Sequence, residues 1–299
     1  MKTILVPIDL ASSAEHTLAY ANKLAVRWPA EVVLLHCHHG DGLTAEESTQ
    51  LEQQLHTLAE RLRYQQLTRQ DGRRIRYHYR VLSGCLHDHV QAEAASYAAD
   101  LVVMSLDYID CGRVEATGNH AATITGLVSC PVLVVPPGRR SLPTRVAFSA
   151  DFSTLDLNVL PKTSALEGAF PAQLQFVQFY APASRPERAR LKRAMEKAAS
   201  QLTWPDITTH LVEDDDPLEG ISDFCARTQT QLLIIAPTNS ASLLRFFDLC
   251  YAKTQSYHTQ IPVLVIQQNE QKPTTACCDR CAQQALRETQ AALVLGAHI

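Results

Sequence analysis

The sequence lacks any apolar run that approaches the roughly 20 residues needed to span a membrane. Its first residues lack the charged, apolar and small-residue sections of a signal peptide, so we expect a cytoplasmic protein. Charge of one sign is also missing, because the formal net charge is -4 and the basic clusters at residues 73–76 and 139–140 are short. The composition therefore gives no electrostatic reason to expect a nucleic-acid partner.

A recognisable catalytic arrangement is missing as well. No nucleophile stands at a convincing spacing from a base, and no carboxylates are paired for acid–base chemistry. Asp214-Asp215-Asp216 precedes Pro217, which is typical of a helix start, where the helix dipole favours negative charge. The nine cysteines are an odd number without an export signal, which favours reduced thiols over a disulfide framework. We therefore expect a non-enzymatic protein.

What the sequence does contain is an internal repeat. Cys-Pro-Val-Leu-Val-Val at residues 130–135 returns as Ile-Pro-Val-Leu-Val-Ile at residues 261–266. A shift of 142 maps Asp9 onto Asp151, whereas a shift of 131 maps residues 100–104 onto 231–235. The difference between the two shifts makes the second copy 11 residues shorter, and we place this loss in the helix expected over residues 44–70.

Each copy alternates short apolar runs with segments of helical period, which is typical of parallel strands joined by helical crossovers. The strands expected in the first copy are residues 3–8, 31–37, 75–82, 101–105 and 132–135. The helices expected between them are residues 12–27, 44–70, 87–97 and 119–129. The strands expected in the second copy are residues 145–149, 173–180, 207–212, 232–237 and 263–266.

The chain is long enough for two cores, since 299 residues are 46% hydrophobic. Prolines and a glycine in residues 136–143 indicate a linker between the copies. We therefore predict two α/β domains, at residues 1–138 and 144–267, and a C-terminal helical tail over 268–299.

Four landmarks of the first copy resemble a universal stress protein domain. They are the strand 4–9, an apolar strand ending in His36, the segment 98–104 and the final strand 130–135. The resemblance extends to about residue 267 as two tandem domains. It implies Rossmann-like, adenine nucleotide alpha hydrolase-like domains of five parallel strands and a stress-response or signalling role. It also implies that the two final strands pair as an intramolecular pseudodimer, with a homodimer of such chains left open.

The ATP-binding branch of this family carries Gly-x2-Gly-x9-Gly-Ser/Thr, a turn whose backbone N–H groups approach the phosphates. The corresponding positions in the first copy are Ser105, Tyr108, Gly118 and Asn119. Those in the second copy are Ala236, Asn239, Leu249 and Cys250. One glycine of three remains in the first copy and none in the second. The resemblance therefore implies a degenerate nucleotide motif in domain 1 and a site in domain 2 that does not bind a triphosphate.

Other pocket elements keep a ligand hypothesis open for domain 1. Asp9 follows the first strand, where parallel sheets place their ligand crevice, and Asp151 holds the same position in domain 2. The alternative is that both aspartates cap the turn or helix that follows. The candidate ligand-binding residues of domain 1 are Pro7, Asp9, Met104, Ser105, Gly118 and Asn119. Candidate ligands are ATP, AMP or another small molecule that needs fewer phosphate contacts.

Two clusters raise a metal hypothesis. His-Cys-His-His at residues 36–39 holds good zinc and copper ligands, but successive side chains of a strand point to opposite faces, so we expect a structural role. The tail holds Cys277, Cys278 and Cys281, of which the last two form a CxxC, half of a zinc site or a dithiol redox pair. An amphipathic helix is expected over residues 282–295. The tail is therefore a metal- or thiol-sensing element, or a helix that docks on a domain.

Overall fold

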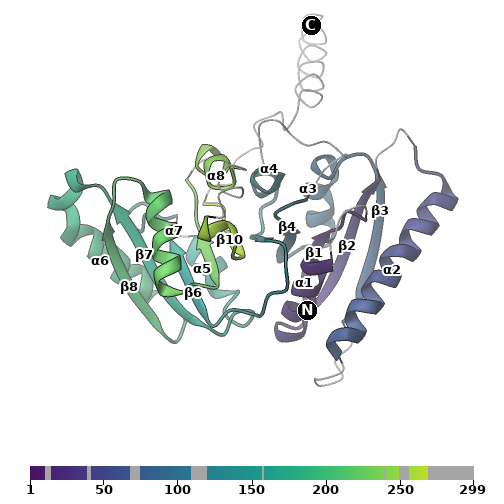
Figure 1. Cartoon of the computed structure of the whole chain (residues 1–299), viewed down its shortest axis with the longest axis horizontal. Helices are drawn as coiled ribbons and strands as arrows, with labels where there is room; N and C mark the ends of the chain where they lie inside the picture. Colours follow the sequence, from purple (N-terminus) through teal and green to yellow (C-terminus); the bar gives the residue numbers. More distant parts are fainter. Residues whose placement is uncertain are drawn as a thin grey trace, which may run out of the picture.

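The structure is a computed structural model that describes residues 1–10, 15–38, 42–67, 75–108, 120–156, 158–238, 240–248 and 256–268. Within these ranges two α/β units share one sheet of ten strands (Figure 1). The strand order is β3-β2-β1-β4-β5-β10-β9-β6-β7-β8. No helix of the described ranges is long and apolar enough to cross a membrane.

The first unit has five parallel strands. They are β1 (Lys2–Pro7), β2 (Ala30–His38), β3 (Tyr77–Ser83), β4 (Leu101–Ser105) and β5 (Val132–Val135). Its helices are α1 (Glu15–Arg27), α2 (Ala45–Leu67), α3 (Leu86–Ser96) and α4 (His120–Leu127). The predicted alternation of strands and helical crossovers is confirmed.

The second unit repeats this order. Its strands are β6 (Arg145–Ser149), β7 (Gln173–Tyr180), β8 (Ile207–Glu213), β9 (Leu232–Ile235) and β10 (Val263–Val265). Its helical segments are α5 (Val159–Ser164), η1 (Pro182–Glu187), α6 (Arg188–Ser200), α7 (Pro217–Thr228), α8 (Ser240–Phe246) and η2 (Tyr257–Thr259). The helix α2 has 23 residues and α6 has 13, so the shortening of the second copy falls mainly here (Figure 1).

The two units join through their final strands, as predicted. β5 and β10 run antiparallel, with Leu133 opposite Leu264. Side chains reinforce this contact, because Lys162 Nζ donates to the Ser129 carbonyl at 3.1 Å and Gln267 Nε2 donates to the Thr125 carbonyl at 3.0 Å. The chain is therefore an intramolecular pseudodimer in which β5 and β10 protect each other's edge.

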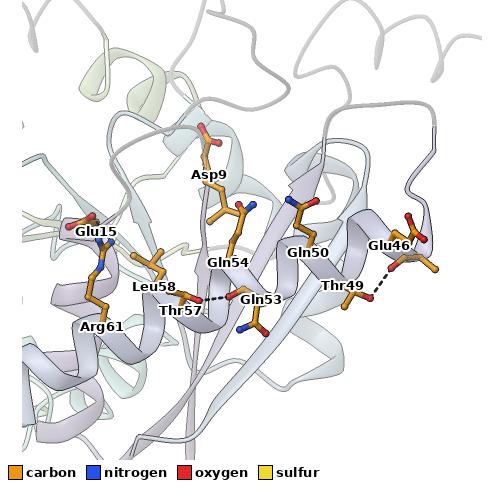
Figure 2. Close-up of a pocket in the computed structure, with 12 residues that line it drawn as sticks. Asp9, Glu15, Glu46, Thr49, Gln50, Gln53, Gln54, Thr57, Leu58 and Arg61 are labelled. Atoms are coloured by element: carbon orange, nitrogen blue, oxygen red, sulfur yellow. Dashed lines mark hydrogen bonds and ion pairs between the residues drawn. The ribbon is translucent and has the colours of Figure 1, made fainter.

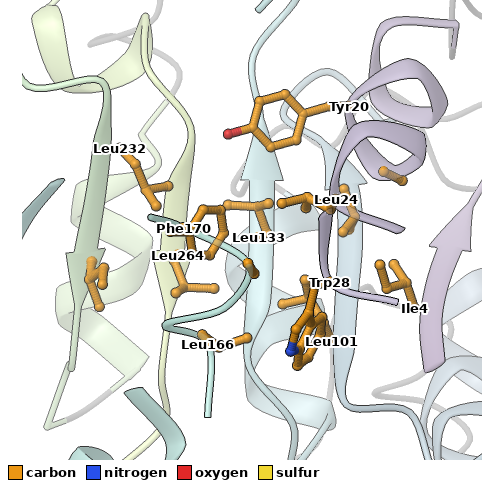
Figure 3. Packing of buried hydrophobic residues seen from close by; sticks show 14 of the residues in the cluster. Ile4, Tyr20, Leu24, Trp28, Leu101, Leu133, Leu166, Phe170, Leu232 and Leu264 are labelled. Atoms are coloured by element: carbon orange, nitrogen blue, oxygen red, sulfur yellow. The ribbon is translucent and has the colours of Figure 1, made fainter. Parts of the chain in front are cut away.

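Apolar side chains fill both faces of the sheet across the boundary between the units. In β4, Leu101 and Val103 belong to the layer beneath α1 and α2, whereas Val102 and Met104 belong to the layer beneath α3 and α4. Figure 3 shows side chains of both units, such as Leu133 and Leu264, in the first of these layers. Strands buried on both faces explain why the sequence shows continuous apolar runs rather than alternation.

The cysteines depart from expectation at one position. Cys37, Cys130 and Cys225 are not disulfide-bonded, whereas Cys85, the residue before α3, takes part in a disulfide. The expectation of reduced thiols is therefore wrong at Cys85, because a count of cysteines does not tell which of them meet in the fold. Burial raises the pKa of Cys130 to about 11 and that of Cys225 to about 12, so neither thiol is reactive near neutral pH.

Candidate functional site

A groove of about 980 Å³ lies between the end of β1 and the helix α2 (Figure 2). Asp9 and Leu10 line it from the chain after β1, and Glu15 lines it from the start of α1. The α2 residues that line it are Ala45, Glu46, Thr49, Gln50, Gln53, Gln54, Thr57, Leu58 and Arg61. The carboxyl end of β1 is where open parallel sheets bind ligands, and small-molecule sites span about 300–1,000 Å³.

The helix α2 offers this surface because its lining residues recur at intervals of three and four, on one side of the helix. A capping box fixes its start: the Glu47 carboxylate accepts hydrogen bonds from the Thr44 N–H at 2.9 Å and from its hydroxyl at 2.7 Å. These bonds lower the pKa of Glu47. Leu55, Ala59 and Leu62 bury the opposite stripe of the helix against the sheet.

The groove has distinct ends (Figure 2). Glu46 lies at the first turn of α2, and an ion pair between Arg61 and Glu15, 2.6 Å long, lies at the other end. The Thr49 and Thr57 hydroxyls donate to carbonyls of their own helix. The polar groups left for a ligand along the middle of α2 are therefore the glutamine amides, and Gln54 extends toward Asp9.

The structure does not bring all predicted site residues together. Asp9 lines the groove, and Pro7, the last residue of β1, is buried beneath it. Met104 is fully buried in the layer beneath α3 and α4, on the face of the sheet opposite to α2, so it does not reach the groove. Gly118 and Asn119 lie outside the described residues.

Ser105 is held between two side chains at the end of β4. His16 Nε2 lies 2.9 Å from its hydroxyl oxygen, and that hydroxyl donates to the Asp107 carboxylate. A hydroxyl has one proton, so His16 donates to this oxygen rather than accepting from it. An activated serine needs the reverse, with the imidazole as base. The cluster therefore does not prepare Ser105 for nucleophilic attack.

The turn after β4 is also poorly suited to phosphate. The Leu106 N–H donates to the Val135 carbonyl at 2.9 Å, and the Tyr108 N–H points to the Ser105 carbonyl at 3.4 Å. Both N–H groups are thus engaged within the protein, and the Asp107 carboxylate adds negative charge at the same turn. In the described part of the motif, these two N–H groups are therefore not directed at a phosphate.

In domain 2 the equivalent aspartate is saturated with hydrogen bonds. Asp151 accepts from the Ser153 N–H and hydroxyl, from the Thr154 hydroxyl and from Gln178 Nε2, at 2.7–3.0 Å. Burial raises the pKa of this carboxyl, but the four hydrogen bonds outweigh burial and hold the pKa below its ordinary value. Asp151 therefore holds its own turn together.

Side chains fill the space beside Asp151. Phe152 stacks on Phe176 with ring centroids 4.4 Å apart and meets Phe148 edge-on. Gln268, which is 5% exposed, donates to the Ala236 carbonyl and accepts from the Asp156 N–H. Ala236 is the first position of the nucleotide motif in domain 2. The side-chain amide of Gln268 therefore already binds the turn that a ligand would contact.

The histidine cluster at the end of β2 has a structural role in its described part. His36 is 6% exposed, and its Nδ1 lies 2.9 Å from the Ile8 carbonyl. The described residues contain no group of three or more His, Cys, Asp or Glu side chains that could hold a metal ion. His39 and the tail cysteines Cys277, Cys278 and Cys281 lie outside the described residues.

Sequence reasoning missed the α2 side of the groove. The signal was present, because polar residues recur at positions 46, 50, 53, 54, 57 and 61 of a segment expected to be helical. A polar helix face usually faces solvent, so this pattern alone does not indicate a binding site. Only the three-dimensional structure shows that this face of α2 lies close to the end of β1.

Two domains of five parallel strands, covered by helices on both faces of the sheet, define the class of Rossmann-like α/β proteins. Within this class, residues 1–136 match the universal stress protein family. The first domain is therefore a universal stress protein domain, and the second domain repeats its fold.

Solved structures resemble nearly the whole chain. A universal stress protein from Archaeoglobus fulgidus DSM 4304 shares 14% identity with a TM-score of 0.59, over 89% of this chain and 96% of that one. A putative universal stress protein from Pseudomonas aeruginosa UCBPP-PA14 shares 16% identity with a TM-score of 0.57, over 89% and 93%. The cytoplasmic domain of a prokaryotic cation chloride cotransporter shares 11% identity with a TM-score of 0.53, over 91% and 98%. At these identities the likeness shows the fold alone. Comparison with curated proteins finds no match.

Proposed function

We propose that the chain is a non-enzymatic, cytoplasmic stress-response or signalling module that binds a small ligand in domain 1. Its units are residues 1–138 and 144–267, with a tail over 268–299. One contrast supports the proposal: the end of the first strand is hollow beside Asp9 and filled by Phe152 beside Asp151. A homodimer of such chains would be a further level of assembly.

The chemistry of the described residues supports a binding role over a catalytic one. Ser105 is hydrogen-bonded in the wrong sense for a nucleophile, and the groove lining contains no thiol or hydroxyl that a base activates. A ligand held between α2 and the end of β1 would instead stabilise α2 on its sheet. Binding at a hundred times Kd adds about 2.7 kcal/mol to the free energy of unfolding.

The test introduces a phenylalanine into the groove of domain 1, at the position that corresponds to Phe152 in domain 2. Leu10→Phe places in domain 1 the residue that stands at position 152, and Tyr64→Phe on the exposed side of α2 is the control. Native mass spectrometry of the freshly purified chain should show one small-molecule adduct, lost in Leu10→Phe and kept in Tyr64→Phe. Equal adducts in all three proteins, or none in any, would overturn the proposal.

A nucleotide is the alternative ligand, because Asp9 lies in the groove where this family's aspartate contacts the nucleoside. Asp107 and the engaged turn after β4 disfavour ATP more than AMP. Thermal-shift measurements with each nucleotide decide: stabilisation by AMP, absent in Leu10→Phe, would support a nucleotide site with few phosphate contacts.

Metal or thiol sensing through the tail is the other alternative. Metal analysis of the purified chain and of a Cys278→Ser, Cys281→Ser variant tests it. Zinc that is present in the parent protein and absent in the variant would support a sensing tail, whereas equal metal content would leave the tail without a metal role.

A further inference from the structure

The groove along α2 carries more negative than positive charge. Among the described residues, its lining holds three carboxylates, Asp9, Glu15 and Glu46, and one cation, Arg61. Because Arg61 pairs with Glu15 at 2.6 Å, these two charges offset each other. Glu46 makes no ion pair with another described residue. A concave surface lined by one sign of charge concentrates the opposite ion, so the groove favours cations.

The start of α2 does not reverse this preference. A helix N-terminus normally attracts anions through its dipole and its unpaired N–H groups. Here Glu46 and Glu47 occupy the first turn, and Glu47 forms the capping box with Thr44. The positive end of the helix is therefore already matched by carboxylates of the protein.

The shape of the groove adds a second requirement. It follows α2 from Glu46 to Arg61, a length of about 22 Å at the rise of an α-helix. Apolar Leu10 and Leu58 lie among its polar residues. Gln50 and Gln54 add amide oxygens that accept hydrogen bonds from N–H donors. A fitting ligand is long, carries several N–H donors and has short apolar segments between them.

We propose that this groove binds a linear aliphatic polyamine, a proposal that rests on the assignment of the ligand site to domain 1. Ammonium groups contact the carboxylates of Asp9 and Glu46, the amide oxygens of Gln50 and Gln54 bind along the chain, and methylene segments pack on Leu10 and Leu58. The described part of domain 2 offers no equivalent, because Phe152 packs on Phe176 beside Asp151 and α6 is shorter than α2. The stoichiometry is one polyamine per chain.

Isothermal titration calorimetry of the full chain with spermidine tests the proposal. Glu46→Gln removes one carboxylate of the groove and should weaken binding about 5- to 10-fold. Glu52→Gln makes the same charge change on an exposed position of α2 outside the groove and should change affinity less than 2-fold. Binding should also weaken between 50 and 300 mM salt, because exposed charges are screened.

Equal losses in Glu46→Gln and Glu52→Gln would overturn the proposal, since they indicate attraction to the surface of α2 in general. AMP binding that Leu10→Phe abolishes, with no heat from spermidine, would keep the ligand site of domain 1 and reject its cationic ligand. If spermidine does not bind and native mass spectrometry finds no adduct, the ligand site itself is rejected.

Discussion

The two domains have the same strand order, but the end of the first strand borders a groove in domain 1 and packed side chains in domain 2. In domain 1, His36 contacts the backbone carbonyl of Ile8, and Asp9 lines a groove. In domain 2 the residue at the place of His36 is Gln178, which donates to Asp151 and accepts from the Phe152 N–H. The residue at this position therefore has different partners in the two domains: His36 of β2 contacts Ile8, whereas Gln178 of β7 contacts Asp151 and Phe152.

A second difference reinforces the first. Leu10, Leu34 and Val6 in domain 1 correspond to three phenylalanines in domain 2, which pack on one another. The long α2 walls the groove, whereas α6 has 13 residues. A duplicated fold can thus keep its sheet while side chains fill the ligand crevice in one of the two copies.

The largest effect on stability is expected at Phe152, compared with Leu10 at the matched position of domain 1. Phe152→Ala should lower the free energy of unfolding by about 3–5 kcal/mol, because it leaves a cavity beside Phe176. Leu10→Ala, at the matched position, should cost about 1 kcal/mol because this side chain is half-exposed in the groove. Urea denaturation of both variants measures the difference, and equal costs would show that Leu10 is also a core residue.

Domain 2 should also be the more acid-sensitive domain. Burial lowers the pKa of His258 from 6.5 to about 4, although a hydrogen bond with the backbone of Phe246 acts in the opposite direction. The unfolded chain takes up this proton first, so stability is full above pH 6.5 and falls until about pH 4. The loss is about 3 kcal/mol.

The matched residue of domain 1 is Leu127, which provides the test. His258→Leu should flatten the dependence of the urea midpoint on pH between 6.5 and 4. An unchanged slope would mean that other groups cause the acid sensitivity.

A smaller loss of stability is expected at Gln178, the hydrogen-bond partner of Asp151. Gln178→Leu leaves the Phe152 N–H without its partner and removes one hydrogen bond from Asp151, so it should cost about 1–3 kcal/mol. Gln65→Leu on the exposed side of α2 is the control and should stay within about 0.5 kcal/mol. Urea denaturation at pH 7 compares them, and a cost no larger than that of the control would show that Asp151 does not depend on Gln178.

The loss on Gln178→Leu should also shrink at low pH. The hydrogen bonds of Asp151 hold its pKa below 3.8, so they stabilise the fold above that pH and lose this contribution as the carboxyl is protonated. A cost that does not change from pH 7 to pH 3 would assign it to the Phe152 N–H alone.

The smallest effect is expected in the groove itself. Glu46→Gln should change the free energy of unfolding by less than about 0.5 kcal/mol, because the carboxylate is exposed and makes no ion pair with another described residue. The same variant should weaken spermidine binding, so stability and binding separate at this position. A large loss of stability would instead give Glu46 a structural role.

The sequence predicts the sheet well and the site poorly, for physical reasons. Strands such as Leu101–Ser105 are buried on both faces, so their apolar runs are visible in one dimension. Asp9 and Asp151 follow equivalent strands, and no local pattern shows that Gln178, 27 residues away in the sequence, donates a hydrogen bond to Asp151. Met104 is a candidate pocket residue from the sequence, and the structure places its side chain in the layer beneath α3 and α4, opposite α2.

The most direct test of the account is a crystal structure of the full chain soaked with small organic probes such as isopropanol and acetamide, which require no knowledge of the natural ligand. We expect probe molecules to gather along α2 beside Asp9 and Leu10, with none beside Asp151 and Phe152. Probes bound next to Asp151, or a groove in domain 1 closed by its own side chains, would contradict the contrast between an open groove beside Asp9 and a filled space beside Asp151.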